Sequence, residues 1–275
     1  MLYFSSILQT DPTYKPAADR LFTALSSAGV EYQLISDTHD IWVRDFMPIQ
    51  IRDGSLVSFR YEPSYLDDTP ELKTNFKKDL SAQFLFSMTY SDINLDGGNV
   101  VFSPSKEKAI VSDRILAENP GVTQSKLISD LERQLKAQVI LIPSLNRKYD
   151  MTGHAEGMVR FVDENTVVGN YVASKNGLEQ RIKSVLQDYR IDVIDFPYFS
   201  SPNGSAIGCY LNFLETKNHI FLPVFGDALD EKAVKSAKKI FSKIIIPVRI
   251  NEIAKEGGIL NCMSWEVEQT EEMKN

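Results

Sequence analysis

Five side chains in this sequence carry groups that could act together in one chemical step. They are one thiol, one imidazole and three carboxylates: Cys262, His154, Asp45, Asp96 and Glu156. Cys262 follows a Gly-Gly pair at 257–258, and glycine lets the backbone adopt turns that present a side chain rather than bury it. A core position is the alternative, because free cysteines are among the most buried residues. A thiol within reach of an imidazole is the pairing that nucleophilic catalysis uses.

The partner of such a cluster is expected to be a planar cation. Three carboxylates alone could hold a hard metal ion, but the thiol and the imidazole beside them favour a guanidinium. Carboxylates bind this group in bidentate pairs and would hold its central carbon for attack by Cys262. The bound cation and an imidazolium would favour the thiolate. His154 would protonate the leaving ammonia and then activate water, so the predicted reaction converts a guanidinium to a ureido group.

A repeated unit would bring these residues together. Amphipathic helices precede β-rich runs at 15–27 and 32–35, at 123–138 and 139–142, at 177–189 and 191–194, and at 230–241 and 244–248, with a weaker copy over 70–86. The loop after each unit carries one unexpected polar residue, and the steps between them are about 51, 58, 58 and 50 residues: Asp45, Asp96, His154, Asn212 and Cys262. Such a period over five units predicts a closed array with one loop per unit on a common axis.

Composition limits the class of protein. The chain has 275 residues, 43% of them hydrophobic, and no break in composition, so we expect one domain over 1–275. A net charge of −7 argues against a nucleic-acid partner. The sequence has no apolar run long enough to span a bilayer, and its start lacks a basic region before a signal-like stretch. Two distant cysteines make no disulfide framework. We expect a cytoplasmic protein.

Several blocks resemble one known family. Residues 42–48 read Trp-Val-Arg-Asp-Phe-Met-Pro, 95–99 read Leu-Asp-Gly-Gly-Asn, 153–157 read Gly-His-Ala-Glu-Gly and 257–263 read Gly-Gly-Ile-Leu-Asn-Cys-Met. In this order they resemble the signature blocks of the agmatine deiminase and Porphyromonas-type peptidylarginine deiminase family, within the guanidino-group modifying superfamily. The resemblance implies an α/β fold, a five-bladed pseudo-symmetric propeller (the pentein fold), with a cysteine nucleophile and neither metal nor cofactor.

The resemblance also assigns roles. It makes Cys262 the nucleophile and His154 the general acid/base. It gives the grip on the guanidinium to Asp45 and Glu156, and places Asp96 near the histidine or the substrate. It implies that Trp42 lines the pocket, where a cation can rest on its face, and that Asn212 is a pocket asparagine. Asp96 before two glycines also fits an Asx turn, and Trp42 also fits a core.

The sequence departs from the family pattern at two places. Glu156 stands where the family usually has Asp, and the triple glycine before the cysteine reads Glu256-Gly257-Gly258. Arg60 is a candidate substrate-binding residue, because at the pocket rim it would pair with a substrate carboxylate. That would favour arginine-like substrates, whereas acidic residues at the rim would favour an amine tail.

The favoured function is a deiminase that acts on a small cationic guanidino substrate through a covalent thiouronium intermediate, with agmatine converted to N-carbamoylputrescine. The alternatives are a peptidyl-arginine or free-arginine deiminase, an amidinotransferase that uses the same thiol and imidazole, and a non-catalytic binding protein of the same fold. We expect neither nucleic acid nor membrane as a partner, and leave homo-oligomerisation open.

Overall fold

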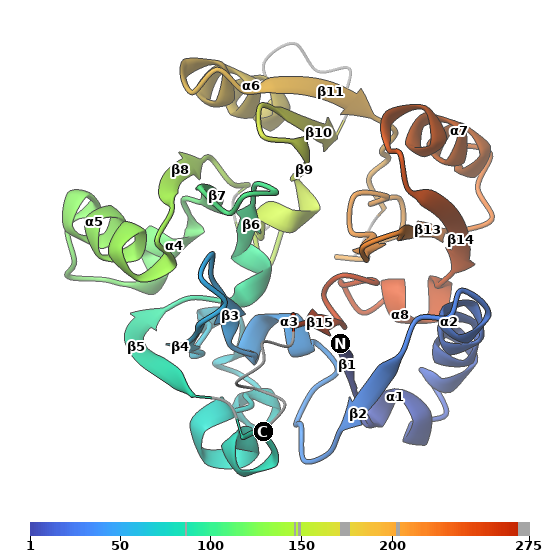
Figure 1. The fold of residues 1–275 in the computed structure, drawn as a ribbon, viewed down its shortest axis with the longest axis horizontal. Helices are drawn as coiled ribbons and strands as arrows, with labels where there is room; N and C mark the ends of the chain where they lie inside the picture. Colours follow the sequence, from blue (N-terminus) through green and yellow to red (C-terminus); the bar gives the residue numbers. More distant parts are fainter. Residues whose placement is uncertain (86, 146, 148–149, 171–176, 202–203, 269–275) are drawn as a thin grey trace.

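Five three-stranded sheets surround a common centre (Figure 1). The structure, a computed structural model, describes all residues except 86, 146, 148–149, 171–176, 202–203 and 269–275. In each sheet the inner strand is antiparallel to the middle strand, and the middle strand is parallel to the outer one. This common pattern confirms the predicted fivefold repeat.

From inner to outer strand, the sheets consist of β15 (Trp265–Glu266), β1 (Leu2–Ser5) and β2 (Tyr32–Ile35); β3 (Ile49–Gln50), β4 (Leu56–Arg60) and β5 (Met88–Asn94); β6 (Val100–Phe102), β7 (Lys108–Ser112) and β8 (Gln138–Ile142); β9 (Val159–Asp163), β10 (Thr166–Asn170) and β11 (Asp192–Phe196); and β12 (Leu214–Glu215), β13 (His219–Val224) and β14 (Ile244–Arg249).

Helices connect the parallel pairs, because two parallel strands need a long crossover connection. The outer connections hold α1 (Ile7–Thr10) and α2 (Lys15–Ser27), α4 (Arg114–Glu118) and α5 (Gln124–Leu135), α6 (Leu178–Asp188), and α7 (Asp230–Ile240). The expected helix over 123–138 ends earlier, because Lys136 takes a left-handed backbone (φ 52°) and Gln138 already belongs to β8. Its predicted cap is confirmed, since the Thr123 hydroxyl accepts from the amide of Lys126.

The weakest predicted repeat, 70–86, contains only short turns in its described part: Pro70–Leu72, Phe76–Leu80 and Ser81–Gln83. Their apolar residues still pack inward, and Phe76 and Leu80 are buried. The second blade is therefore covered by turns where the other connections carry α-helices.

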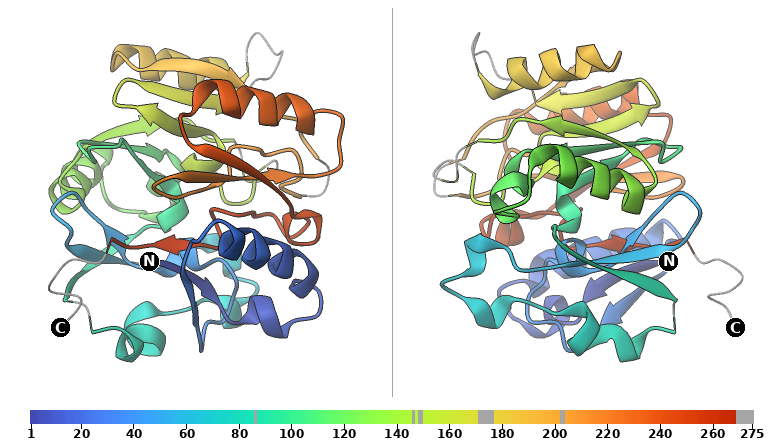
Figure 2. Two further views of the ribbon diagram at one scale, coloured as in Figure 1. Left: turned by 45° about the vertical axis from the view of Figure 1, so that its right-hand side comes forward. Right: turned by 90° about the vertical axis from the view of Figure 1, so that its left-hand side faces the viewer.

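The ring is closed by the two ends of the chain. The C-terminal strand β15 pairs with the N-terminal strand β1, with Leu2 opposite Glu266 and Tyr3 opposite Trp265. In both views of Figure 2 the red β15 lies beside the blue first sheet. This pairing leaves β1 with a neighbour on each side, so the first blade matches the other four.

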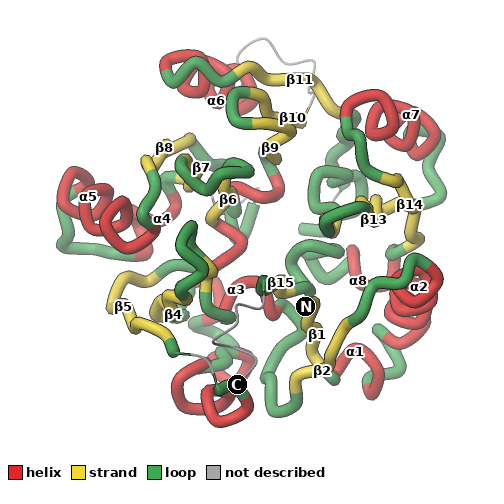
Figure 3. The backbone as a smooth tube through the Cα atoms, viewed as in Figure 1, coloured by secondary structure: helices red, strands yellow, loops and turns green. Residues whose placement is uncertain are grey.

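Short turns around the centre precede each inner strand, as Figure 3 shows. They are α3 (Val43–Phe46), the turns 97–99 and 155–157, and the irregular segments before β12 and β15. Apolar clusters between the sheets and the outer helices hold this frame; on α2, Leu21 and Leu25 are fully buried. Each such side chain contributes roughly 2 kcal/mol through burial. No helix in the described part is long and apolar enough to cross a membrane.

Candidate active site

The turn that carries Cys262 is fixed by an asparagine from the neighbouring blade. Asn212 lies just before β12, and its side-chain oxygen accepts from the amides of Asn261 (3.0 Å) and Cys262 (3.3 Å). Its amide nitrogen lies 3.0 Å from the Cys262 Sγ. One side chain therefore holds both the backbone and the thiol of this turn.

The thiol faces a carboxylate. Cys262 Sγ donates to Glu156 Oε1 at 2.8 Å, and the same oxygen accepts from Asn212 at 2.9 Å. The side-chain amide of Asn261 donates to the other oxygen, Oε2. Glu156 is buried, so these contacts fix its orientation beside the sulfur.

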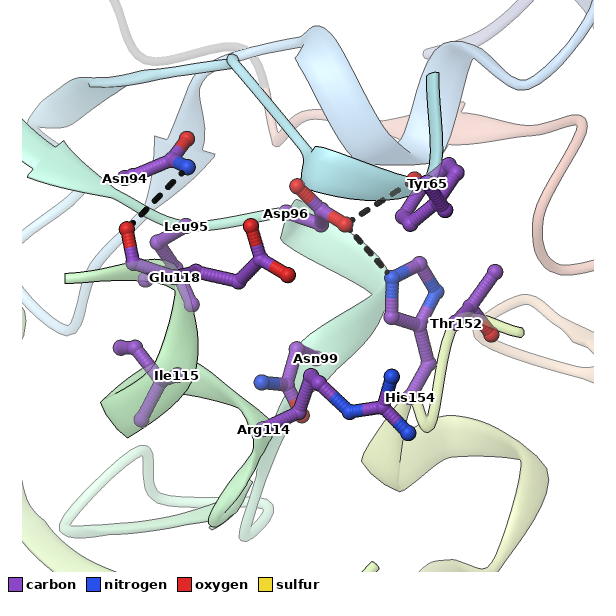
Figure 4. A pocket seen from close by; sticks show the side chains of 10 residues that line it. All are labelled: Tyr65, Asn94, Leu95, Asp96, Asn99, Arg114, Ile115, Glu118, Thr152 and His154. Atoms are coloured by element: carbon purple, nitrogen blue, oxygen red, sulfur yellow. Dashed lines mark hydrogen bonds and ion pairs between the residues drawn. The ribbon is translucent and has the colours of Figure 1, made fainter. Parts of the chain in front are cut away.

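A second group surrounds the imidazole. His154 Nε2 lies 2.8 Å from Asp96 Oδ2, which also accepts from the Tyr65 hydroxyl at 3.0 Å (Figure 4). The other ring nitrogen, Nδ1, lies 3.6 Å from Asp45 Oδ1. His154, Asp45 and Asp96 are all buried, so both nitrogens of the ring face carboxylates away from bulk water.

Glycine is needed where the two groups meet. A Cβ on Gly98 would lie 2.6 Å from Asp45 Oδ1 and 2.8 Å from His154 Nδ1, closer than real Cβ contacts. The amide of Gly98 instead donates to Asp45 Oδ1 at 3.1 Å. The sequence Asp-Gly-Gly therefore serves two purposes, because it presents Asp96 and lets the backbone approach Asp45 and His154.

The charges of the site determine its protonation. Burial opposes protonation of His154, but Asp45 and the hydrogen bond to Asp96 outweigh it and raise the pKa of the imidazole to about 10. Burial also raises the pKa of Asp45, which His154 opposes. Burial therefore favours the neutral form of Asp45 and a bound cation would favour its carboxylate, so three acidic side chains around one imidazolium suit a cationic ligand.

Without a bound cation, the pKa of the Cys262 thiol is not lowered. Burial, followed by the Glu156 and Asp45 carboxylates, raises the pKa of Cys262 well above its usual range. The sequence correctly predicts the neighbours, but the carboxylates meant for a substrate also repel a thiolate. A bound cation is therefore required before the thiolate becomes favourable.

A pocket of about 180 Å³ gives access to this cluster. Its walls include Cys262, His154, Glu156 and Asn212, and further out the carboxylates of Asp150 and Glu179. No lysine or arginine is among its described lining residues. Apart from His154, the ionisable groups of its described lining are therefore acidic side chains, two cysteines and a tyrosine. Among the described residues, no group of three or more His, Cys, Asp or Glu has an arrangement that would hold a metal ion.

The structure brings six of the eight predicted site residues together, although only Cys262, His154, Glu156 and Asn212 of these line the pocket, and it separates two. Trp42 packs on the Cys262 turn, where a Cβ on Gly258 would lie 2.5 Å from its ring, but it is not among the described residues that line the pocket. Arg60 ends β4 with an exposed side chain and is likewise absent from that lining. Substrate binding by these two residues stays a prediction that the geometry does not support.

Three residues of the site were not predicted. Tyr65 lies in a turn without a recognisable pattern, and only the fold places it on Asp96. Asn261 precedes Cys262, so its position was the available signal. Arg114, at the start of α4, donates to the carbonyl oxygens of Leu145 (2.7 Å), Asp150 (3.2 Å) and Met151 (3.2 Å). It thereby holds the pocket wall that leads to His154.

Solved structures share this architecture. Agmatine deiminase from C. jejuni matches with a TM-score of 0.73 over 97% of this chain and 92% of its own, at 19% identity. DDAH from Pseudomonas aeruginosa matches with a TM-score of 0.59 over 91% of this chain and 88% of its own, at 13% identity. Similarity at such identities establishes the fold, and the predicted five-bladed α/β propeller, the pentein fold, is confirmed.

Sequence comparison identifies the family. A protein of Selenomonas ruminantium, provisionally named agmatine deiminase, is 20% identical over 94% of this chain and 82% of its own length. The sequence pattern of the Porphyromonas-type peptidyl-arginine deiminases matches residues 6–267. This match covers nearly the whole chain, so the chain belongs to the Porphyromonas-type peptidyl-arginine deiminase family, as its signature blocks predicted.

Proposed function

We propose that this protein hydrolyses the guanidinium group of a small cationic substrate to a ureido group and ammonia, with Cys262 as the nucleophile. One observation carries the proposal. The Cys262 thiol lies 2.8 Å from the Glu156 carboxylate, in the same pocket as a histidine held between two further carboxylates. A binding module of the same fold has no need for a half-buried thiol beside a buried carboxylate.

The first half-reaction follows from this geometry. A guanidinium bound between Asp45 and Glu156 brings positive charge beside the thiol and lowers its pKa, so the thiol releases its proton to solvent. The Cys262 thiolate then forms a C–S bond to the guanidinium carbon. The imidazolium of His154 donates its proton to one nitrogen, and breaking of that C–N bond releases ammonia. A cationic thiouronium remains on Cys262.

The second half-reaction uses the same groups in reverse. His154, now neutral, accepts a proton from water as the water oxygen attacks the thiouronium carbon. The C–S bond then breaks, and the proton of the hydroxyl on the substrate carbon passes to the departing sulfur, which restores the Cys262 thiol and leaves a neutral ureido group. Asp96 and Tyr65 hold the imidazole in place during both transfers.

The charges of the pocket favour an amine tail on the substrate. Asp150 and Glu179 line the pocket beyond the cluster, and its described lining offers no cation to a carboxylate. Agmatine, which has an ammonium tail, is therefore the favoured substrate, with N-carbamoylputrescine as product. The similarity to the C. jejuni agmatine deiminase, also solved with its substrate bound, supports this choice.

Release of ammonia and ureido product tests the proposal. The panel consists of agmatine, guanidinobutyrate, free arginine and a peptide ending in arginine. Agmatine and guanidinobutyrate differ at the tail, which is cationic in one and anionic in the other. We expect turnover of agmatine, and loss of turnover in Cys262→Ser but not in Cys209→Ser. Burial raises the pKa of Cys209 to about 12, which makes it the matched inert thiol. Amidino transfer would instead require an added amine, and an inert panel would contradict the deiminase proposal.

A further inference from the structure

A second, larger cavity of about 750 Å³ lies on the other side of Glu156. The five inner strands each begin near one turn of the active site and continue away from it, and residues of all five line this cavity: Gln50, Val101, Arg160, Glu215 and Glu266. Glu156 lines both the active-site pocket and this cavity. The carboxylate of Glu156 therefore belongs to the walls of both cavities.

The charges of this cavity differ from those of the active-site pocket. Its lining includes five basic residues, Arg44, Lys106, Arg160, Lys217 and Lys243, and four glutamates, Glu156, Glu215, Glu266 and Glu268. The active-site pocket has no basic residue among its described lining. The lining of the larger cavity therefore carries five basic and four acidic groups, so this cavity offers charges of both signs to a ligand.

Two of the cations are already neutralised by one glutamate. Glu215 lies 3.4 Å from Arg160 and 2.9 Å from Lys243, and Arg160 also donates to the carbonyl oxygen of Phe213 at 3.1 Å. Lys106 donates to the carbonyl oxygen of Gln50 at 3.0 Å. These contacts hold Arg160, Lys243 and Lys106 along the wall of the cavity.

Arg44 and Glu266 face the cavity without an ion-pair partner within 4.0 Å among the described residues, as do Lys106, Lys217 and Glu268. The Nε of Arg44 donates to the carbonyl oxygen of Asn261 at 3.3 Å, and neither terminal nitrogen has a hydrogen-bond partner among the described residues. Burial lowers the pKa of Arg44; the carboxylates of Glu156 and then Glu266 oppose this shift, while the guanidinium of Arg160 adds to it.

We propose that this cavity binds a small zwitterion, a molecule with both a carboxylate and an ammonium group, such as an amino acid. The free guanidinium fork of Arg44 matches a carboxylate in bidentate geometry. The carboxylate of Glu266 accepts from the ammonium group. A ligand with one charge only would be attracted by one of these residues and repelled by the other, so the zwitterion is the best complement.

Arg44 also connects the cavity to the nucleophile. Its backbone amide donates to the carbonyl oxygen of Cys262 at 3.0 Å, and its Nε contacts the preceding residue, Asn261. Asn261 in turn bonds Glu156, the carboxylate beside the thiol. A ligand that orients Arg44 therefore acts on the turn that presents Cys262.

Calorimetric titration of the whole protein tests the proposal without reference to catalysis. The probes are γ-aminobutyrate, butyrate and butylamine, which share a four-carbon chain and differ in their charged groups. We expect γ-aminobutyrate to bind more tightly than either analogue, and Glu266→Gln to weaken it roughly tenfold to a hundredfold, as for the loss of a charged hydrogen bond. Glu231→Gln, an exposed glutamate of α7, is the matched control and leaves binding unchanged.

Two controls separate this site from the active site. Glu179→Gln, in the active-site pocket alone, leaves γ-aminobutyrate binding unchanged if the ligand occupies the second cavity, and any butylamine bound in the acidic active-site pocket is insensitive to Glu266→Gln. Arg44→Lys keeps the charge but loses the fork, so it weakens γ-aminobutyrate binding while circular dichroism shows the fold intact. The absence of γ-aminobutyrate binding at millimolar concentration, or equal binding of butyrate that Glu266→Gln does not change, would overturn the proposal.

Discussion

At the scale of single residues, the same carboxylates affect both the binding of a cation and the ionisation of Cys262. The carboxylates that suit a guanidinium also keep the Cys262 thiol protonated, because burial and the charges of Glu156 and Asp45 all oppose the thiolate. In the proposed mechanism the positive charge of the substrate offsets this effect, so the thiolate forms when the substrate is bound.

Glu156→Gln separates these two roles of the carboxylate. The amide carries no negative charge, so the pKa of Cys262 falls, and a fall of about one unit raises the thiolate fraction near neutral pH tenfold. We expect faster alkylation of Cys262 by iodoacetamide in the variant, while agmatine turnover falls because the substrate loses one carboxylate. Alkylation rates measured from pH 6 to 10 check this. Slower alkylation in the variant than in the unaltered protein would contradict the conclusion that the Glu156 carboxylate raises the pKa of Cys262.

Gly98→Ala tests the close approach between the two halves of the site. The added Cβ would lie 2.6 Å from the Asp45 carboxylate and 2.8 Å from His154, so at least one of them must move. A displacement of about 1 Å costs roughly a hundredfold in rate, and we expect such a loss in kcat without loss of fold. Gly157→Ala is the matched control, since its Cβ meets only the Cys209 sulfur at 4.0 Å. Equal kcat for Gly98→Ala and Gly157→Ala would mean that the close contact of Gly98 with Asp45 and His154 does not affect the rate.

At the scale of elements, the position of Arg114 explains how the pocket wall is held. The wall from Leu145 to Gly153 has no helix or strand in its described part, and Arg114 supplies the hydrogen bonds that regular structure would otherwise provide. Gly153 adopts a left-handed backbone (φ 64°) beside it, where a Cβ would lie 3.0 Å from the guanidinium. A buried side chain on α4 thus defines the shape of a loop.

Arg114→Met should therefore loosen the substrate wall. The substitution leaves three carbonyl oxygens without their donor, and each hydrogen bond to a charged group is worth about 1.5–3 kcal/mol. We expect a higher KM for agmatine and faster amide hydrogen exchange over 150–153, with a smaller change in kcat. Arg133→Met, which removes an exposed ion pair with Asp130, serves as control and changes little. An unchanged KM in Arg114→Met would show that the loop holds its own shape.

The sequence predicts elements well where a local pattern decides them. The spacing of apolar residues places α2, α6 and α7 to within a residue at each end, and the Thr123 cap places the start of α5. The contact between Tyr65 and Asp96 joins residues 31 positions apart through a turn without periodicity, so no local signal reveals it. The thiol pKa depends on burial and on distances between blades, and these exist only in the folded protein.

At the scale of the whole molecule, the active site depends on closure of the ring. Its side chains come from the turns of five blades, and the turn with Cys262 leads directly into β15, the strand that pairs the C-terminal part of the chain with β1. The spacing of the polar residues predicted the convergence, because five equal units must share an axis. The spacing alone could not show which end of the chain completes the first blade.

Trp265→Ala tests whether closure and catalysis are coupled. Trp265 is buried in β15, donates from its indole nitrogen to the carbonyl oxygen of Pro48 at 2.7 Å, and packs with its ring centre 5.0 Å from that of Tyr3. Loss of a buried aromatic side chain costs about 3–5 kcal/mol, so thermal denaturation should occur at a markedly lower temperature. Because β15 follows the nucleophile by three residues, we expect kcat to fall even at temperatures where the variant is folded. A destabilised variant with full kcat would show that the Cys262 turn is held by Asn212 and Arg44 without help from the closing strand.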